Sequence, residues 1–302
     1  MTRIVLIGRS GQVGWELERC LVGLGEVVAL GRSQLDLGDP VGVGAVVAAH
    51  GPDLIVNAAA FTDVEGAEGD EASALAVNAH AVRSLAETAR VCHAALIHYS
   101  TDYVFDGTSA EPYAEDDPAA PLNAYGRSKL EGEQAIRASG CAHLILRTSW
   151  VYAARGRNFL RTILRLAAQR PELRIVDDQH GAPTSARLIA QVTALMMHGL
   201  IASPGARRDV DAGTTVHVAA SGATTWYGFA CEMREHALRL GLSFRAHLVP
   251  IRSEEYPTRA RRPRNSRLRL DRLAREWNIV TPAWQSGLRL CMEEIAAGHE
   301  AG

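Results

Sequence analysis

Apolar and polar positions alternate along the first half of the chain in a pattern that predicts strands separated by helices. Short apolar runs rich in β-branched residues predict strands, and longer runs with an apolar residue every three or four positions predict helices. The predicted strands are residues 3–7, 26–30, 54–60, 94–99 and 143–148, and the predicted helices include residues 15–21 and 71–91. This alternation predicts an α/β fold with a doubly wound parallel sheet, whose ligands lie beyond the carboxyl ends of the strands.

Three glycines follow the first predicted strand. Gly8, Gly11 and Gly14 have the spacing G-x-x-G-x-x-G and enclose Gln12 and Val13 at the start of a helix. Glycines at this spacing let the backbone approach a diphosphate at the positive N-terminal end of the helix. A turn that only needs positive φ would explain one glycine, but hardly three in this register. The pattern therefore predicts a Rossmann-like dinucleotide site formed by these residues.

The ends of the next strands predict the rest of the cofactor site. Arg32 follows the second strand, where an arginine accommodates a 2′-phosphate and an acid favours a 2′-hydroxyl. We therefore predict NADPH as the cofactor and keep NADH as the alternative, since Arg32 could equally be a solvated surface side chain. Small residues after the third strand would let a flat ligand lie against the backbone. The further cofactor contacts that we predict are Asp36, Leu37, Ala58, Ala59, Ala60, Thr62 and Tyr99.

After residue 150 the alternation of strands and helices loosens. Helices are predicted over residues 158–168, 185–197, 225–240 and 282–297, and short strands over residues 173–176 and 216–219. We expect residues 1–150 to form the dinucleotide-binding domain, with residues 184–219 returning to it. Residues 151–183 and 220–302 are expected to form a smaller C-terminal α/β lobe that binds the substrate.

Tyr125 and Lys129 stand four residues apart in a helix-compatible run, so both side chains lie on one helix face. A neighbouring ammonium favours the phenolate and lowers the pKa of a tyrosine, which makes it a better general acid. An isolated Y-x-x-x-K pattern is more often an exposed amphipathic helix. Here the preceding strand ends at Ser100 and Thr101, where the Tyr125 hydroxyl would meet them, and the context favours a catalytic pair.

Composition and charge exclude several classes of function. The 302 residues carry a formal net charge of -2, which gives no overall attraction to nucleic acid or to an anionic membrane. The five cysteines are dispersed and form no C-x-x-C pair, which argues against a disulfide framework and a thiolate metal site. Neither an export signal nor a membrane span is indicated. We therefore expect a cytoplasmic protein.

Arginines gather locally between residues 259 and 272. Planar guanidinium groups bind diphosphate oxygens in pairs, and we choose Arg262 as the residue that contacts a nucleotide diphosphate. Nucleic-acid binding would need a broad basic face with interleaved aromatic residues, which the overall acidic balance does not support.

The motifs together resemble the extended short-chain dehydrogenase/reductases and, more closely, the dTDP-4-dehydrorhamnose reductase family. The first resemblance rests on the glycine turn, Thr101 and the Tyr-x-x-x-Lys pair. The second rests on blocks that span nearly the whole chain: GQVGWEL (11–17), VNAAA (56–60), HYSTDYVF (98–105), PLN-x-YG (121–126), RTSWVY (147–152), DQ-x-GAPT (178–184) and RP-x-NS (262–266).

The resemblance implies that NAD(P)H reduces the C4 ketone of dTDP-4-dehydro-β-L-rhamnose, the last step in forming dTDP-L-rhamnose. By match of position, Tyr125 would donate the proton, Lys129 would hold the nicotinamide ribose, and Thr101 would hydrogen-bond the substrate oxygen. A phenol and a hydroxyl aimed at that oxygen would stabilise the charge that hydride transfer creates. The family also implies sugar contacts from Asp102, Tyr103 and Trp150, although Trp150 alone would read as a core aromatic residue.

Two other functions stay open at this point. One is reduction of a different nucleotide-linked 4-keto sugar, because no feature of the sequence selects thymidine. The other is a regulatory subunit of the same fold that binds a dinucleotide without catalysis. The intact Thr101, Tyr125 and Lys129 favour an enzyme.

Some members of the resembled family are described as dimers in which acidic side chains gather around a divalent metal such as Mg²⁺. Glu16 and Glu294 match two of those positions, but the third position falls on Arg187. A guanidinium cannot ligate a cation and repels it. We therefore predict no metal and expect Arg187 to pair with both glutamates, the alternative being three separate solvated side chains. A homodimer stays open.

Overall fold

The central element of the fold is a parallel sheet. The computed structural model describes residues 1–202 and 213–300. Within these residues, strands assemble into one sheet in the order β10-β5-β4-β3-β1-β2, and every neighbouring pair is parallel. The strands are β1 (Arg3–Ile7), β2 (Glu26–Leu30), β3 (Leu54–Asn57), β4 (Ala95–Thr101), β5 (His143–Thr148) and β10 (Thr214–His217). The predicted doubly wound α/β fold is confirmed.

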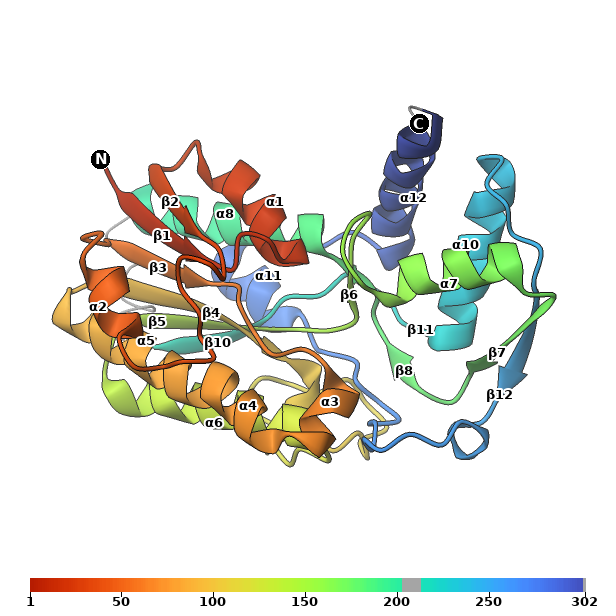
Figure 1. Ribbon diagram of the computed structural model, residues 1–302, viewed down its shortest axis with the longest axis horizontal. Coiled ribbons are helices and arrows are strands. Elements are labelled where there is room, and N and C mark those ends of the chain that lie inside the picture. The colour runs from red at the N-terminus through yellow and green to blue at the C-terminus, as the bar shows by residue number, and fades with distance from the viewer. Residues whose placement is uncertain (203–212, 301–302) are drawn as a thin grey trace.

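Helices cover both faces of this sheet, because successive side chains of a strand point to opposite faces and both sets are apolar. Figure 1 shows α1 (Gln12–Leu21) and α8 (Ala186–Ala202) on one face and α2 (Val43–Ala48), α5 (Ala81–Val91) and α6 (Ala124–Ser139) on the other. Leu6 and Val56 pack toward the first pair of helices, whereas Ile55 and Leu96 pack toward α2, α5 and α6. The sheet is thus buried on both sides.

The helix predicted over residues 71–91 contains a wider turn. It consists of three consecutive segments: α4 (Glu71–Leu75), the π-helical segment η1 (Ala76–His80) and α5. A short helix, α3 (Val64–Gly69), precedes them. The carbonyl of Asn78 in the wider turn contacts α6 at Gly132, where an added Cβ would lie only 2.1 Å from that oxygen. Gly132 therefore allows the two helices to pack closely.

The second part of the molecule has its own apolar core. Phe229 and Met233 of α10 pack there with Leu173 of β7 and Leu288 of α12, and Figure 1 shows these elements beside the main sheet. The elements are β6 (Val151–Tyr152), α7 (Phe159–Gln169), β7 (Glu172–Val176), β8 (His180–Gly181), β9 (Thr184–Ser185), β11 (Thr224–Thr225), α10 (Trp226–Arg239), β12 (His247–Ile251) and α12 (Trp284–Glu300). β7 pairs with β12, β8 with β11, and β6 with β9.

The predicted division into two domains stays a prediction, and one helix departs from it. α11 (Asp271–Trp277) lies within the stretch assigned to the smaller lobe, yet Leu273 packs in the core of the main sheet. β10 pairs with β5, whereas residues 203–212 of the segment expected to return lie outside the described residues. In the described part of the chain, no helix is long and apolar enough to cross a membrane.

Candidate active site

A cavity of about 1090 Å³ lies at the carboxyl ends of the sheet strands. Its wall runs from the glycine turn after β1, past the ends of β3 and β4, to Trp226 at the start of α10. This volume exceeds the roughly 300–1,000 Å³ typical of a site for one small ligand. The cavity can therefore accept a long ligand, or two ligands side by side.

The glycine turn forms a cradle that a side chain would fill. Gly8 has φ +88°, and an added Cβ would lie 2.7 Å from the backbone nitrogen of Ala59. Gly11 caps α1 without any side-chain hydrogen bond, so the first N–H groups of this helix are free to bind an anion. Gly8, Gly11, Gln12 and Val13 all line the cavity, and the turn fits a dinucleotide diphosphate.

Gly14 is the predicted cofactor residue that the structure places elsewhere. It does not line the cavity, and an added Cβ would lie 2.1 Å from the carbonyl oxygen of Gly8. Gly14 lets α1 pack closely on the turn, and a direct cofactor contact by this glycine stays a prediction.

The other predicted cofactor residues line the cavity as a continuous wall. At its outer end Arg32 donates from Nε to Asp36 Oδ2 at 3.2 Å, and the Arg32 side chain is 83% exposed. The Gly38 N–H and then Arg32 lower the pKa of Asp36. The other predicted cofactor contacts that line the cavity are Leu37, Ala58, Ala59, Ala60, Thr62 and Tyr99.

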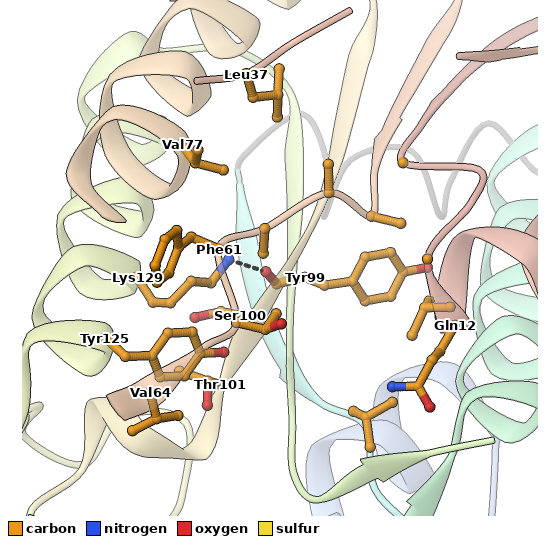
Figure 2. Close-up of a pocket in the computed structure, with 18 of the residues that line it drawn as sticks. Gln12, Leu37, Phe61, Val64, Val77, Tyr99, Ser100, Thr101, Tyr125 and Lys129 are labelled. Carbon is orange, nitrogen blue, oxygen red and sulfur yellow. Dashed lines mark hydrogen bonds between the residues drawn. The ribbon is translucent and has the colours of Figure 1, made fainter. Parts of the chain in front are cut away.

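Tyr125 stands in the first turn of α6, which Asn123 caps by accepting from the Gly126 N–H at 2.8 Å. Figure 2 shows the Tyr125 hydroxyl beside Thr101, and both residues line the cavity. Burial raises the pKa of Tyr125 to about 12, although a hydrogen bond with Thr101 acts in the opposite direction. The expected lowering of the Tyr125 pKa by Lys129 is therefore wrong, because burial has the larger effect.

Lys129 lies one turn further along α6, and its side chain also extends from the helix toward the cavity. Its Nζ donates to the Tyr99 carbonyl oxygen at 2.6 Å and lies 3.1 Å from His98 Nε2. Figure 2 draws the first of these contacts. Burial lowers the pKa of Lys129 to about 8, while Glu133 acts to raise it. The Lys129 Nζ is thus bonded to β4, and burial determines the direction in which the pKa of Tyr125 moves.

The predicted substrate residues gather at the inner end of the cavity. Asp102 is 3% exposed and accepts from Thr101 Oγ1 at 2.9 Å. Burial raises the pKa of Asp102 to about 7. Tyr103 lies beside it, and Arg262 pairs with Glu65 at 2.6 Å. Tyr103 and Arg262 both line the cavity.

Trp150 reaches the cavity from the end of β5 with an unusual backbone, because its φ is +47°. Its ring stacks on that of Trp226, with centroids 3.5 Å apart and planes 5° apart. Its Nε1 donates to Ser266 Oγ at 3.1 Å. The sequence did not indicate Trp226, because it belongs to a helix start far along the chain.

The comparisons with known proteins agree with this arrangement. The family model described as the RmlD substrate binding domain matches residues 1–297. A dTDP-4-dehydrorhamnose reductase of Burkholderia thailandensis is 46% identical, over 97% of this chain and 99% of the relative. The chain belongs to the dTDP-4-dehydrorhamnose reductase family. The predicted family and the class of NAD(P)H-dependent oxidoreductase acting on a nucleotide-sugar ketone are confirmed.

Further members of the dTDP-4-dehydrorhamnose reductase family match over equally long stretches. The reductase of Escherichia coli K12 is 43% identical over 97% of each chain. The crystal structure of the Bacillus anthracis reductase in complex with NADP has a TM-score of 0.86 and 31% identity. It covers 97% of this chain and 100% of that chain, so the likeness includes both parts of the molecule.

The metal that the family resemblance implies does not fit the side chains of this chain. Arg187 lies between the two glutamates, 3.4 Å from Glu16 Oε2 and 2.7 Å from Glu294 Oε2. The predicted pairing of Arg187 with both glutamates is confirmed. A guanidinium at this place repels a cation and already satisfies the two carboxylates. We therefore assign no step to a divalent metal.

Proposed function

We propose that the protein uses NADPH to reduce the C4 ketone of dTDP-4-dehydro-β-L-rhamnose to dTDP-L-rhamnose. One observation supports this proposal most directly. Tyr125, Thr101 and Lys129 line the same cavity as the glycine turn. Bound nicotinamide would supply the hydride. Reductases with the same named activity are 43% and 46% identical to this chain over nearly its whole length.

Tyr125 is the proton donor in this proposal. Its raised pKa of about 12 keeps the hydroxyl protonated at neutral pH, which an acid needs before the reaction. Negative charge develops on the C4 oxygen as hydride arrives, and the Tyr125 and Thr101 hydroxyls stabilise it. Since Thr101 donates to Asp102 here, it must turn its proton toward the sugar oxygen when substrate binds.

The sugar and its diphosphate would contact the inner end of the cavity. Asp102 and Tyr103 offer polar atoms to sugar hydroxyls, and the indole of Trp150 offers an apolar face. Arg262 would bind the diphosphate. Because Arg262 now pairs with Glu65, the diphosphate would have to compete with that carboxylate.

Arg32 supports NADPH over NADH. Its guanidinium lies at the outer end of the cavity and is mostly exposed, so it can turn to a 2′-phosphate with little desolvation cost. Asp36 could instead hold a 2′-hydroxyl, which keeps NADH as the alternative. The Bacillus anthracis relative was solved with NADP. The five free cysteines fit a reducing compartment, and we place the reaction in the cytoplasm.

The test is to incubate purified protein with dTDP-4-dehydrorhamnose and NADPH and to follow the absorbance of the reduced nicotinamide. We expect turnover, and we expect it to be slower with a 4-keto sugar linked to a different nucleotide. Faster turnover of that other substrate would replace the proposed substrate. Tight NADPH binding without turnover of either sugar would favour the regulatory subunit.

A further inference from the structure

A row of three buried polar side chains runs inward from Lys129 in the cavity wall. Asn57 of β3 and His98 of β4 are register partners, and both point to the sheet face that α6 covers. Asn57 Nδ2 lies 3.1 Å from His98 Nδ1, and His98 Nε2 lies 3.1 Å from Lys129 Nζ. All three residues are 1% exposed or less. These three side chains therefore make no hydrogen bonds to bulk water. Each of their N–H donors needs an acceptor within the protein.

The direction of the Asn57 amide decides where the protons are. The backbone N–H of Ala59 can only donate, and it donates to Asn57 Oδ1 at 3.2 Å. The Asn57 amide nitrogen must then face His98 Nδ1 and donate to it. If the amide were reversed, Asn57 Nδ2 would face the Ala59 N–H, and two donors would meet. The buried hydrogen bond between Ala59 and Asn57 would then be lost. Nδ1 of His98 is consequently an acceptor that carries no proton.

His98 must then carry its proton on Nε2. Burial is the main cause that holds the pKa of His98 well below its usual range, so the ring is neutral and has one N–H. That N–H points at Lys129 Nζ, which already donates one hydrogen to the Tyr99 carbonyl. An ammonium has no lone pair to accept from His98. A neutral amine satisfies both contacts.

We propose that the Asn57–His98 pair favours the neutral amine of Lys129 before the cofactor binds, most fully at alkaline pH, and that NADPH binding draws a proton onto the fraction of Lys129 that is neutral. This inference rests on the proposed function. The proton comes from the buffer and adds to the Nζ lone pair, which breaks the Nε2–H···Nζ contact and frees Nζ from His98. No other bond changes. His98 is thus a positioning residue that acts through Lys129.

The charges around Lys129 agree with this sequence of events. From β4 it faces neutral His98 and the Tyr99 carbonyl, and from α6 it faces Glu133, whose carboxylate is occupied by Arg147. Burial is the main cause that lowers its pKa. An anionic cofactor in the cavity favours the ammonium. The ammonium then stands ready when Tyr125 becomes a phenolate.

Calorimetry of NADPH binding to the cofactor-free protein measures the proton directly. Titrations in two buffers with different ionisation enthalpies give the number of protons taken up at each pH. With a Lys129 pKa of about 8, we expect about half a proton at pH 8, close to one at pH 9.5 and close to none at pH 6. Binding without proton uptake across this range would overturn the inference and leave the proposed function intact. Failure of NADPH to bind would overturn both.

Two variants change the row in different ways. Asn57→Asp replaces the donor by an acceptor, which draws the His98 proton to Nδ1 and leaves Nε2 free to accept from an ammonium. His98→Gln offers an amide oxygen to the ammonium without adding charge. Both should charge Lys129 before binding, so proton uptake at pH 8 should fall from about half a proton to close to zero. Unchanged uptake in both variants would overturn the inference.

Asn78→Asp is the matched control for the added carboxylate. Asn78 is equally buried but donates to Phe61 O and Ser128 Oγ. Proton uptake at pH 8 should persist in Asn78→Asp. If it is lost, the added negative charge, and not the His98 tautomer, would explain the result for Asn57→Asp. Nitrogen NMR of the unmodified, cofactor-free protein tests the tautomer without any variant. We expect the proton on His98 Nε2, and a proton on Nδ1 would overturn the inference.

Discussion

Two ion pairs near the main sheet differ in how much water reaches their charged groups. The Arg147–Glu133 pair lies under α6 near Lys129, outside the cavity lining, and its side chains are 4% and 0% exposed. The Arg32–Asp36 pair lies at the outer end of the cavity, and its side chains are 83% and 49% exposed. Water screens the outer pair, whereas burial makes each charge of the inner pair depend on its partner. Equivalent substitutions should therefore have very different costs in the two pairs.

The largest effect is expected when the buried ion pair is broken. Glu133 accepts two hydrogen bonds from Arg147, at 2.9 and 2.7 Å. Glu133→Gln would leave the Arg147 guanidinium buried without its counterion, and should lower the free energy of unfolding by about 3–5 kcal/mol. Urea denaturation measures this. Asp36→Asn at the outer end is the control and should leave stability unchanged. Equal losses in the two variants would contradict the comparison.

Removing the proton donor is expected to be the next largest effect. Tyr125→Phe keeps the ring in place and deletes the hydroxyl, so kcat should fall by roughly a hundredfold or more, while the Kd of NADPH changes little. Tyr113→Phe is the matched control, because Tyr113 is buried but does not line the cavity. Near-normal turnover of Tyr125→Phe would remove Tyr125 from the mechanism.

A smaller effect is expected at the exposed end. Arg32→Ala should reduce the preference for NADPH over NADH in kcat/KM by roughly tenfold to a hundredfold, as for the loss of one charged hydrogen bond. Steady-state kinetics with both cofactors checks this. Arg90→Ala, on an exposed site of α5 outside the cavity, should leave the preference unchanged. Equal use of both cofactors by the unmodified protein would refute the role of Arg32.

The smallest effect is expected at the Glu16–Arg187–Glu294 cluster, where the Arg187 side chain is 39% exposed. Glu294→Gln should change the free energy of unfolding by about 1 kcal/mol or less. In the unmodified protein, excess chelator followed by added Mg²⁺ should change neither Tm nor the mass found by sedimentation. Loss of either property under chelation, restored by Mg²⁺, would show that a metal site survives.

Local patterns were enough to predict the frame of the fold. The predicted strands 3–7, 26–30 and 143–148 coincide with β1, β2 and β5, because each is a short apolar run between turn residues. The helical turns predicted over residues 71–91 are present, but the π-helical segment depends on the fit of Asn78 against Gly132 in a distant helix. Such contacts between distant segments leave no periodic signal. The helix at residues 43–48 was not predicted.

The residues of the candidate site that belong to a sequence motif could be predicted, and the residues outside the motifs could not. Tyr125 and Lys129 were found from their spacing, and Gly8 and Gly11 from the glycine turn. His98 was missed as a functional residue, since a histidine within an apolar strand reads as part of the core. Its role follows only from the contacts with Asn57 and Lys129. The pKa of Tyr125 was predicted with the wrong sign because the burial that raises it cannot be read from the spacing of the motif.

The stacked Trp150 and Trp226 rings give the protein an optical probe of its own. Their planes are nearly parallel and their ring centroids lie 3.5 Å apart, so we expect the two indoles to couple electronically and to give a shared signal in circular dichroism. Trp150 leaves the end of β5 and Trp226 opens α10, which ties that signal to the spacing between the two parts of the molecule. A ligand that parts the rings would be visible in a stopped-flow trace before any nicotinamide is oxidised.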